Sequence, residues 1–361
     1  MAVSAPFLLT AKNDNKEWRD YLNRFPEEMQ DVYYLPDYYL LNEQAGFGHA
    51  ECFVYTEDDK VFFFPYLKNP IAQIAGVVVD EGFYDFETAY GYGGPICNNR
   101  DPGFCGRAYR AFESHCRDSR MIAGFIRFHP VLKNYELFKE VMEVQFNRHT
   151  VEIPTDVDEK FRWEKIYTHA NRKNINKAKR NKLEVVDRTE EKYWSAFRGL
   201  YEATMVENRA AGFYHFNETY FRLLREKLGK NIKLFSVLSE GEPIAAILFL
   251  LGKKYCHSHL LGSNRDFLGT GSNNYLHHEV LLWAKEKRYD SLHLGGGRTT
   301  DPEDPLLRFK KNYSGKLLDF YIGKSIFIRE KYEEYNRIFV SRTAHPESYN
   351  GFFLKYRQPR S

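Results

Sequence analysis

The alternation of hydrophobic and polar positions predicts short strands and amphipathic helices in the first 150 residues. Two strand-like segments, Glu51–Tyr55 and Val61–Tyr66, flank the polar turn 57–60, a combination typical of a β-hairpin. The spacing of apolar residues predicts three helices and one further strand. These are helices at Trp18–Met29, Asp37–Gln44 and Phe104–Asp118 and a strand at Met121–Phe128.

The second part of the chain repeats this mixture of strands and helices. Predicted strands are Leu183–Val186, Ile232–Leu238, Pro243–Leu251, Lys254–Leu261, Ser291–Leu294, Leu317–Tyr321 and Ser325–Ile328. Predicted helices are Glu190–Arg209, Asn217–Leu228, Asn274–Lys287 and Leu306–Tyr313. The pattern is that of an α/β protein. We expect domains at 1–150 and 151–330, followed by a tail, 331–361, packed on the body.

Composition excludes several classes of protein. The 361 residues are 43% hydrophobic and 28% charged, a balance that argues against disorder. No apolar run approaches the roughly 18–20 residues that cross a bilayer, and the N-terminus lacks the basic region of a signal peptide. Five cysteines without CxxC spacing predict reduced thiols. We therefore expect a cytoplasmic protein without a transmembrane segment, for which peripheral membrane contact stays open.

The charge is distributed unevenly along the sequence. Residues 1–150 carry 15 Lys and Arg against 22 Asp and Glu, whereas the remainder carries 37 against 27. The segment 161–184 alone holds eight basic and two acidic residues, and Arg172, Asn176 and Arg180 share one helical face. Trp163, Ile166, Ala170 and Ala178 would form its apolar stripe. The segment is either a phosphate-contacting helix or a solvated helix between domains, and the spacing alone favours the latter.

The loop 263–275 carries the first chemical signal. Gly269 and Gly271 allow a tight turn, so that successive backbone N–H groups can face an anion where the following helix begins. Arg265 adds a cation. The Arg-x-x-x-Gly-x-Gly pattern suits a phosphate or pyrophosphate, although it is neither a Walker loop nor a complete GxGxxG. The alternative is a structural connection capped by Ser272 or Asn273.

Two further features border the predicted sheet. Three glycines, 295–297, follow a buried strand and permit the close approach of a ligand or of another backbone segment, unless this is an ordinary surface loop. His257 and His259 are two residues apart on a strand and would share a face. Either could act as a general base, or both could be hydrogen-bonded core residues. We expect no metal site, because neither HExxH nor a Cys/His quartet occurs.

Taken in order, these motifs resemble the FemAB-like (peptidoglycan bridge-forming, BioF2-like) branch of the GNAT acyltransferases. The matching segments are Tyr92–Pro95, Phe125–Pro130, the helix with Arg172 and Lys177, Leu294–Gly297, and Arg308–Lys310. The resemblance covers most of residues 30–325. It implies two tandem GNAT-like domains with mixed sheets flanked by helices and a shared cleft. It also implies transfer of an acyl or aminoacyl group to an amine, commonly on a cell-wall precursor.

The resemblance also assigns roles to individual residues. It places Lys310 at the reaction centre and the Arg265–Gly271 loop, with Ser272 and Asn273 after it, at the coenzyme A pyrophosphate. Acceptor or substrate contacts would come from Arg209, Tyr214, Arg172 and Arg308. Two departures matter. The helical arm common in aminoacyl-tRNA-dependent relatives is missing, and no Glu stands out as the base, which leaves His257 or His259.

The sequence thus predicts an acyltransferase that forms an amide on an amino-bearing envelope saccharide or peptidoglycan precursor. Its donor would be an acyl-CoA thioester or an aminoacyl-tRNA ester, with no metal required. The alternative is a non-catalytic RNA-binding protein that uses the basic segment 161–184 and exposed aromatic residues; its affinity for RNA would fall steeply with salt.

Overall fold

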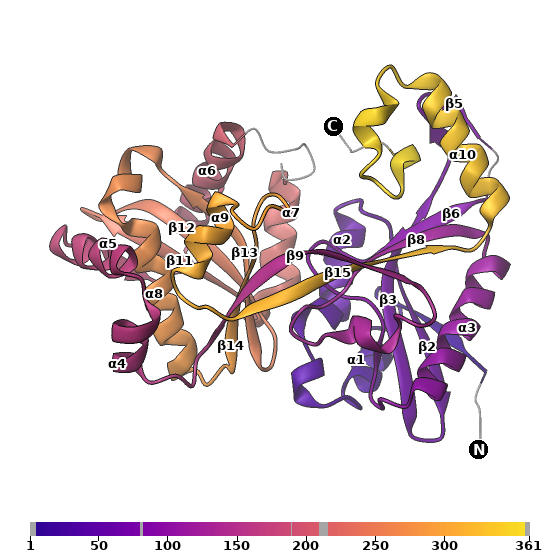
Figure 1. Cartoon of the computed structure of the whole chain (residues 1–361), viewed down its shortest axis with the longest axis horizontal. Coiled ribbons are helices and arrows are strands. Elements are labelled where there is room, and N and C mark those ends of the chain that lie inside the picture. Colours follow the sequence, from indigo (N-terminus) through magenta and orange to yellow (C-terminus); the bar gives the residue numbers. More distant parts are fainter. Residues whose placement is uncertain (1–4, 80–81, 189, 209–215, 358–361) are drawn as a thin grey trace. The chain divides into compact units, whose positions relative to one another are not determined.

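The computed structural model describes residues 5–79, 82–188, 190–208 and 216–357. The chain divides into two compact units, residues 1–147 with 320–361, and residues 148–319. The segment from Phe320 onward therefore belongs with the first unit, because β15 (Leu317–Ile326) pairs antiparallel with β8 (Met121–Arg127). This differs from a linear division at 150 and 330. Figure 1 shows both units, each with strands covered by helices.

The first unit is built on a mixed sheet of the order β1-β2-β3-β6-β8-β15. β6 and β8 are parallel and the other neighbours are antiparallel, while the short β7 pairs with β3. Besides β8 and β15, the strands of the first unit are β1 Phe7–Thr10, β2 His49–Glu57, β3 Lys60–Pro70, β4 Gln73–Ile74, β5 Val77–Val78, β6 Tyr84–Glu87 and β7 Ile96–Cys97. Its helices are α1 Asn15–Leu22, α2 Pro36–Gln44, α3 Pro102–Asp118 and α10 Arg329–Arg342.

Aromatic side chains fill the core of this first unit. Phe64, Phe86 and Phe112 are fully buried and pack with ring centroids 4.8–5.7 Å apart. Rings at such distances add to the free energy gained by burying their area. Part of the high aromatic content of the sequence therefore belongs to this core.

The second unit has the strand order β9-β14-β13-β12-β11-β10. β13 and β14 are parallel, and the other neighbouring strands are antiparallel. The strands are β9 Glu143–Pro154, β10 Glu184–Val186, β11 Ile232–Ser239, β12 Glu242–Leu251, β13 Tyr255–Ser263 and β14 Ser291–Gly296. The helices are α4 Glu159–Phe161, α5 His169–Arg180, α6 Glu191–Glu207, α7 Glu218–Leu223, α8 Ser272–Glu286 and α9 Pro305–Lys311.

Helices cover both faces of this second sheet. Alternate residues of β12, Ala245, Ile247 and Phe249, belong to one core with buried residues of α5 and α8. The residues between them face the other way and are also fully buried, and α6 packs against β12 and β13. Burial on both faces explains why β12 is a continuous hydrophobic run rather than an alternating one.

Most predicted elements are confirmed, but the short strands β1 and β4–β7 were not predicted, and the predicted helix 18–29 ends at Leu22. The predicted strands 317–321 and 325–328 are one strand, β15, and the predicted tail contains a 14-residue helix, α10. The strand β9 was not predicted. The basic segment is not one helix: it breaks at Tyr167, and α5 begins anew after Thr168, whose side chain accepts a hydrogen bond from the Asn171 N–H.

Candidate functional site

Three predicted site residues, His257, His259 and Lys310, lie on or contact β13 and β14, two strands that diverge. The two strands pair at only three positions, from Tyr255 with Ser291 to His257 with His293. Beyond them β13 continues to Ser263 and β14 to Gly296, each still paired with its outer neighbour. The backbone groups that would join the two strands are therefore not paired with each other along this stretch. In an open α/β sheet, such a point is where ligands bind.

A β-bulge lies on β13 at the start of the divergence. Leu248 of β12 pairs with Leu260 and Phe249 with Ser258, so His259 is the extra residue. Bulges locally end regular pairing and redirect side chains. The His259 ring stacks on Tyr220 of α7, and its Nε2 lies 3.0 Å from the Tyr220 hydroxyl. Tyr220 could not be identified as this partner from the sequence pattern.

The environments of the two candidate histidines differ. Burial, and in smaller part His257, lower the pKa of His259 to about 3, so its imidazole is neutral at physiological pH. His257 is fully buried, and its Nδ1 lies 3.5 Å from Nδ1 of His293. Nε2 of His293 in turn lies 2.9 Å from the Thr150 hydroxyl. Both histidines thus take part in hydrogen-bond networks, as the core interpretation expects.

The predicted anion loop connects β13 to α8. Residues Arg265–Thr270 form a 3-10 turn, and Gly271 (φ +84°) precedes the first residue of α8. A Cβ on Gly271 would lie 2.2 Å from the Asn174 carbonyl oxygen of α5, whereas a Cβ on Gly269 would meet nothing within 4 Å. Gly271 is therefore required by backbone conformation and packing, and Gly269 by neither.

The first turn of α8 offers backbone donors to an anion. Among the described residues no side chain caps this helix, so its first N–H groups lack the partner that a capping residue would supply. Arg265 is exposed beside it. The side chain of Asn273 accepts a hydrogen bond from the Ser263 hydroxyl, and buried Ser272 begins the helix. The contact with Ser263 fixes Asn273 at the helix start, and the backbone N–H groups of both residues lie in the first turn of the helix.

Lys310 lies at the end of β14. Its Nζ donates a hydrogen bond of 2.7 Å to the Gly296 carbonyl. Burial lowers the pKa of Lys310 to about 8, with Arg148 adding to this effect and Asp304 opposing it. The amine is thus mainly protonated at pH 7 and loses its proton as the pH rises through about 8.

Asp304 organises the backbone around Lys310. Its carboxylate accepts hydrogen bonds from the N–H groups of Leu306 and Leu307, where it caps α9, and from those of Arg298 and Thr299. Burial raises the pKa of this carboxyl, but the backbone hydrogen bonds outweigh it and hold the pKa at about 2. Asp304 therefore holds residues 298–299 and the start of α9 in position.

The three glycines 295–297, at the end of β14, lie close to other parts of the protein. Gly295 has φ +72° at a register shift between β14 and β9. A Cβ on Gly296 would lie 2.8 Å from the His149 carbonyl oxygen, and one on Gly297 would lie 2.5 Å from Oδ1 of Asp304. Arg148 donates to the Gly297 carbonyl. Gly296 therefore permits the close approach of another backbone segment, which is one of the interpretations that the sequence left open for these glycines.

The structure agrees with only part of the apolar stripe predicted for the basic segment 161–184. In α5, Asn171, Ile175 and Ala178 are buried, whereas Ala170 is exposed, so the predicted apolar stripe was wrong at Ala170. Asn171 is buried because its amide donates to the Asn312 carbonyl and its oxygen accepts from Asn274. Lys173, Asn176, Lys177, Lys179 and Arg180 are exposed.

Of the four predicted substrate contacts, Arg172 and Arg308 fall within the described residues. Arg172 donates to the carbonyls of Trp163 and Tyr167 and so stabilises the turn before α5. Arg308 is exposed on α9. Arg209 and Tyr214 lie outside the described residues.

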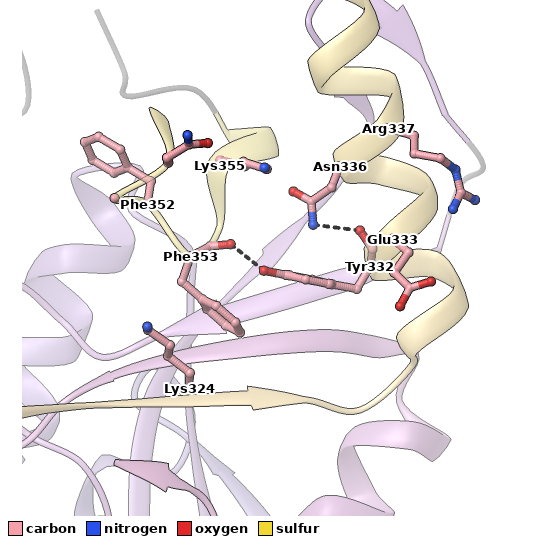
Figure 2. A pocket seen from close by; sticks show the side chains of 10 residues that line it. Lys324, Tyr332, Glu333, Asn336, Arg337, Phe352, Phe353 and Lys355 are labelled. Atoms are coloured by element: carbon pink, nitrogen blue, oxygen red, sulfur yellow. Dashed lines mark hydrogen bonds between the residues drawn. The ribbon is translucent and has the colours of Figure 1, made fainter. Parts of the chain in front are cut away.

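A separate hollow occurs in the first unit. It has a volume of about 490 Å³ and is lined by residues of α10, Lys324 of β15 and the segment 350–355. Figure 2 shows the Tyr332 hydroxyl hydrogen-bonded to the Phe353 carbonyl beside it. It includes none of the predicted site residues.

The fold and this site agree with known proteins. Residues 169–311 match the family described as acetyltransferase (GNAT) domain. Among solved structures, FemX is 13% identical and covers 92% of this chain and 99% of its own (TM-score 0.68). The C-terminal domain of a putative lysylphosphatidylglycerol synthetase from Agrobacterium fabrum is 13% identical, with coverages of 87% and 92% (TM-score 0.56). A tandem GNAT protein from the clavulanic acid biosynthesis pathway is 8% identical, with coverages of 90% and 99% (TM-score 0.51).

No curated protein sequence matches the chain, and at identities of 8–13% the structural likeness shows the fold alone. The chain has a GNAT domain within a tandem GNAT fold, which makes it an acyltransferase. The domain match and the FemX fold confirm the predicted resemblance to the FemAB-like branch of GNAT proteins. No helix in the described part of the chain is long and apolar enough to span a bilayer.

Proposed function

We propose that this acyltransferase forms an amide by transferring an acyl or aminoacyl group to an amino group of a cell-envelope saccharide or peptidoglycan precursor. The observation that carries the proposal is the divergence of β13 and β14 directly before the loop into α8. It lies within the residues that match the GNAT domain. The end of β13 and the N–H groups that begin α8 then lie in one continuous stretch of chain, suited to an acyl donor with a phosphate group.

The first turn of α8 would bind the phosphates of the donor. Its N–H groups carry the positive end of the helix dipole, and Arg265 supplies a full charge. Coenzyme A meets this requirement through its pyrophosphate. An aminoacyl-tRNA also offers phosphates, and the exposed cations of α5, which packs against α8, favour a nucleic-acid donor.

Lys310 would stabilise the transition state. The amine nitrogen attacks the donor carbonyl carbon, a tetrahedral oxyanion forms, and the bond to sulfur or oxygen then breaks as the amine loses its proton. An ammonium fixed beside the reacting carbonyl lowers the energy of the oxyanion. Its hydrogen bond to Gly296 and the capping of α9 by Asp304 hold Lys310 in place.

The lowered pKa of His259 argues against this residue as the proton acceptor. A base whose conjugate acid has a pKa of about 3, as His259 has, cannot efficiently deprotonate an ammonium near pH 7. We therefore propose that the acceptor amine reacts in its neutral form. Its proton would leave to water or to the departing thiolate or alkoxide, and His259 and Tyr220 would orient the reactants.

The nature of the acceptor rests on the resemblance and on the names of similar folds. FemX stands in the FemAB group, and a lysylphosphatidylglycerol synthetase transfers an aminoacyl group to a lipid, as its name says. Both support an acceptor of the cell envelope. The alternative of a non-catalytic RNA-binding protein does not fit an acyltransferase domain; RNA contact remains part of the proposal only as donor recognition.

Calorimetric titration with acetyl-CoA, free CoA and a charged tRNA tests the donor site. The expected result is micromolar binding of one donor class that weakens about tenfold in Arg265→Ala, the loss expected for one charge-assisted contact. The matched control is Arg298→Ala, which removes an exposed arginine just after the three glycines 295–297. Absence of binding by all three ligands would refute the proposed donor site.

A further inference from the structure

Two of the five cysteines lie in contact in the first unit. Cys97 ends the short strand β7, and Cys105 lies in the first turns of α3. The Cys105 thiol points at Cys97 with the two Sγ atoms 3.2 Å apart. A disulfide requires about 2.05 Å, so the sulfurs need to approach by only about 1.2 Å, a change that small side-chain rotations supply.

The surroundings favour Cys105 as the more reactive thiol. Its hydrogen bond with Cys97 lowers its pKa, against the opposing effects of burial and Asp101, and burial raises the pKa of Cys97. A position near the N-terminus of a 17-residue helix further favours the thiolate. A thiol with a lowered pKa beside a second cysteine is the usual arrangement of a cysteine pair that oxidises to a disulfide.

The stretch that joins the two cysteines is short and partly exposed. Both cysteines are buried, but Arg100, Pro102 and Gly103, in the stretch that joins them, are exposed. The Cys105 thiol also contacts the Asn99 carbonyl of this stretch, and local opening of residues 98–103, which costs much less than global unfolding, would expose this sulfur. A small oxidant can reach the sulfurs through this opening.

We propose that Cys97 and Cys105 form an oxidation site, a dithiol that a peroxide converts into an intramolecular disulfide. The Cys105 thiolate attacks one peroxide oxygen, which gives a sulfenic acid and releases water from hydrogen peroxide. The Cys97 thiolate then attacks the Cys105 sulfur, the S–S bond forms, and the sulfenic oxygen leaves as a second water. Two thiols lose two electrons and two protons, and one peroxide is reduced to two waters.

The bond would tie the end of β7 to the start of α3. β7 follows the Tyr92–Pro95 turn and pairs with Phe62 and Phe63 of β3, and Asp101 caps α3 between the two cysteines. A covalent link across this connection restricts opening of residues 98–103. A thiol reductant reverses it, so the site is switchable, and it stands independently of the proposed acyl transfer.

Mass spectrometry after treatment with hydrogen peroxide tests the site. Trypsin cleaves between the cysteines at Arg100, leaving Cys97 on peptide 69–100 and Cys105 on peptide 101–107. We expect the intact protein to lose about 2 Da, the two thiol hydrogens, and the two peptides to appear cross-linked. Dithiothreitol should separate them and restore the mass.

Matched variants make the result specific. Cys97→Ala and Cys105→Ser must each abolish the cross-link, whereas Cys116→Ala, which removes another buried thiol of α3, must retain it. The proposal is overturned if the wild-type peptides stay separate, if Cys105 accumulates sulfinic acid without a cross-link, or if the cross-link joins two molecules.

Discussion

The amine of Lys310 donates a hydrogen bond to the carbonyl oxygen of Gly296, with 2.7 Å between Nζ and the oxygen. Gly296 is the last residue of β14, and β14 has already parted from β13 at His293. The bond therefore fixes a cation at the end of β14, beyond the point where its pairing with β13 has ended. A free lysine side chain would lose considerable conformational entropy on being placed there during the reaction, whereas Lys310 is already ordered.

Replacing Lys310 by alanine tests its catalytic role. We expect turnover to fall by about tenfold or more, because the oxyanion loses its stabilising charge. Turnover under saturating donor and acceptor is the measurement. Lys311→Ala, which removes the exposed neighbouring cation on α9, serves as control and should leave turnover unchanged. A Lys310→Ala protein with a native melting temperature and near-normal turnover would reject the role.

The pH dependence of activity follows from the same side chain. The pKa of Lys310 is about 8, so its charge, and with it the stabilisation of the oxyanion, is lost as pH rises through that value. We expect turnover to decline above pH 8. In Lys310→Arg the cation persists, and the decline should disappear even if the rate is lower. An identical alkaline decline in both proteins would assign it to another group.

Acid should destabilise the second unit through His277. This residue is buried against Tyr313, donates to the Asn273 carbonyl, and has a pKa lowered to about 4, mainly by burial. Between pH 6.5 and 4 the unfolded chain binds more protons than the folded one. The free energy of unfolding therefore falls as pH decreases, by at most about 1.4 kcal/mol per pH unit.

Urea unfolding at several values between pH 7 and 4.5 measures this dependence. His277→Gln should have a shallower dependence than the wild type, whereas His345→Gln, at an exposed position, should not differ from it. Equal slopes for wild type and His277→Gln would show that another group dominates.

The two glycines of the anion loop should differ in their tolerance of alanine. Gly271→Ala places a Cβ 2.2 Å from the Asn174 carbonyl at a positive φ, and we expect it to lower the free energy of unfolding by about 2 kcal/mol or more. Gly269→Ala, with open space around it, should change it by less than about 0.5 kcal/mol. Urea midpoints distinguish the two, and equal effects would contradict the described packing.

Strong hydrophobic runs made much of the fold predictable. β12 and β13 stand out because they are buried and bounded by turns, and the loop into α8 was recognised from its glycines. β9 escaped prediction because its first part, near Glu143, is largely exposed and polar, so hydrophobicity alone did not reveal it.

The candidate site was predictable in its position but less so in its supporting contacts. Lys310 was predicted from the order of the motifs, and the loop at Arg265 from its glycines. The pairing of Asp304 with distant N–H groups and the stacking of His259 on Tyr220 depend on tertiary structure. The burial of Asn171 likewise depends on Asn274, some hundred positions away, and no periodicity signals such a contact.

The most direct test of the account follows a radiolabelled acyl group from donor to acceptor. Acetyl-CoA and a charged tRNA would each be incubated with the protein and a mixture of envelope amino saccharides and peptidoglycan precursors. We expect one donor to yield a labelled product that resists hydroxylamine, as an amide does, and that is strongly reduced in Lys310→Ala. A hydroxylamine-labile ester product, or the same amide yield without Lys310, would contradict it.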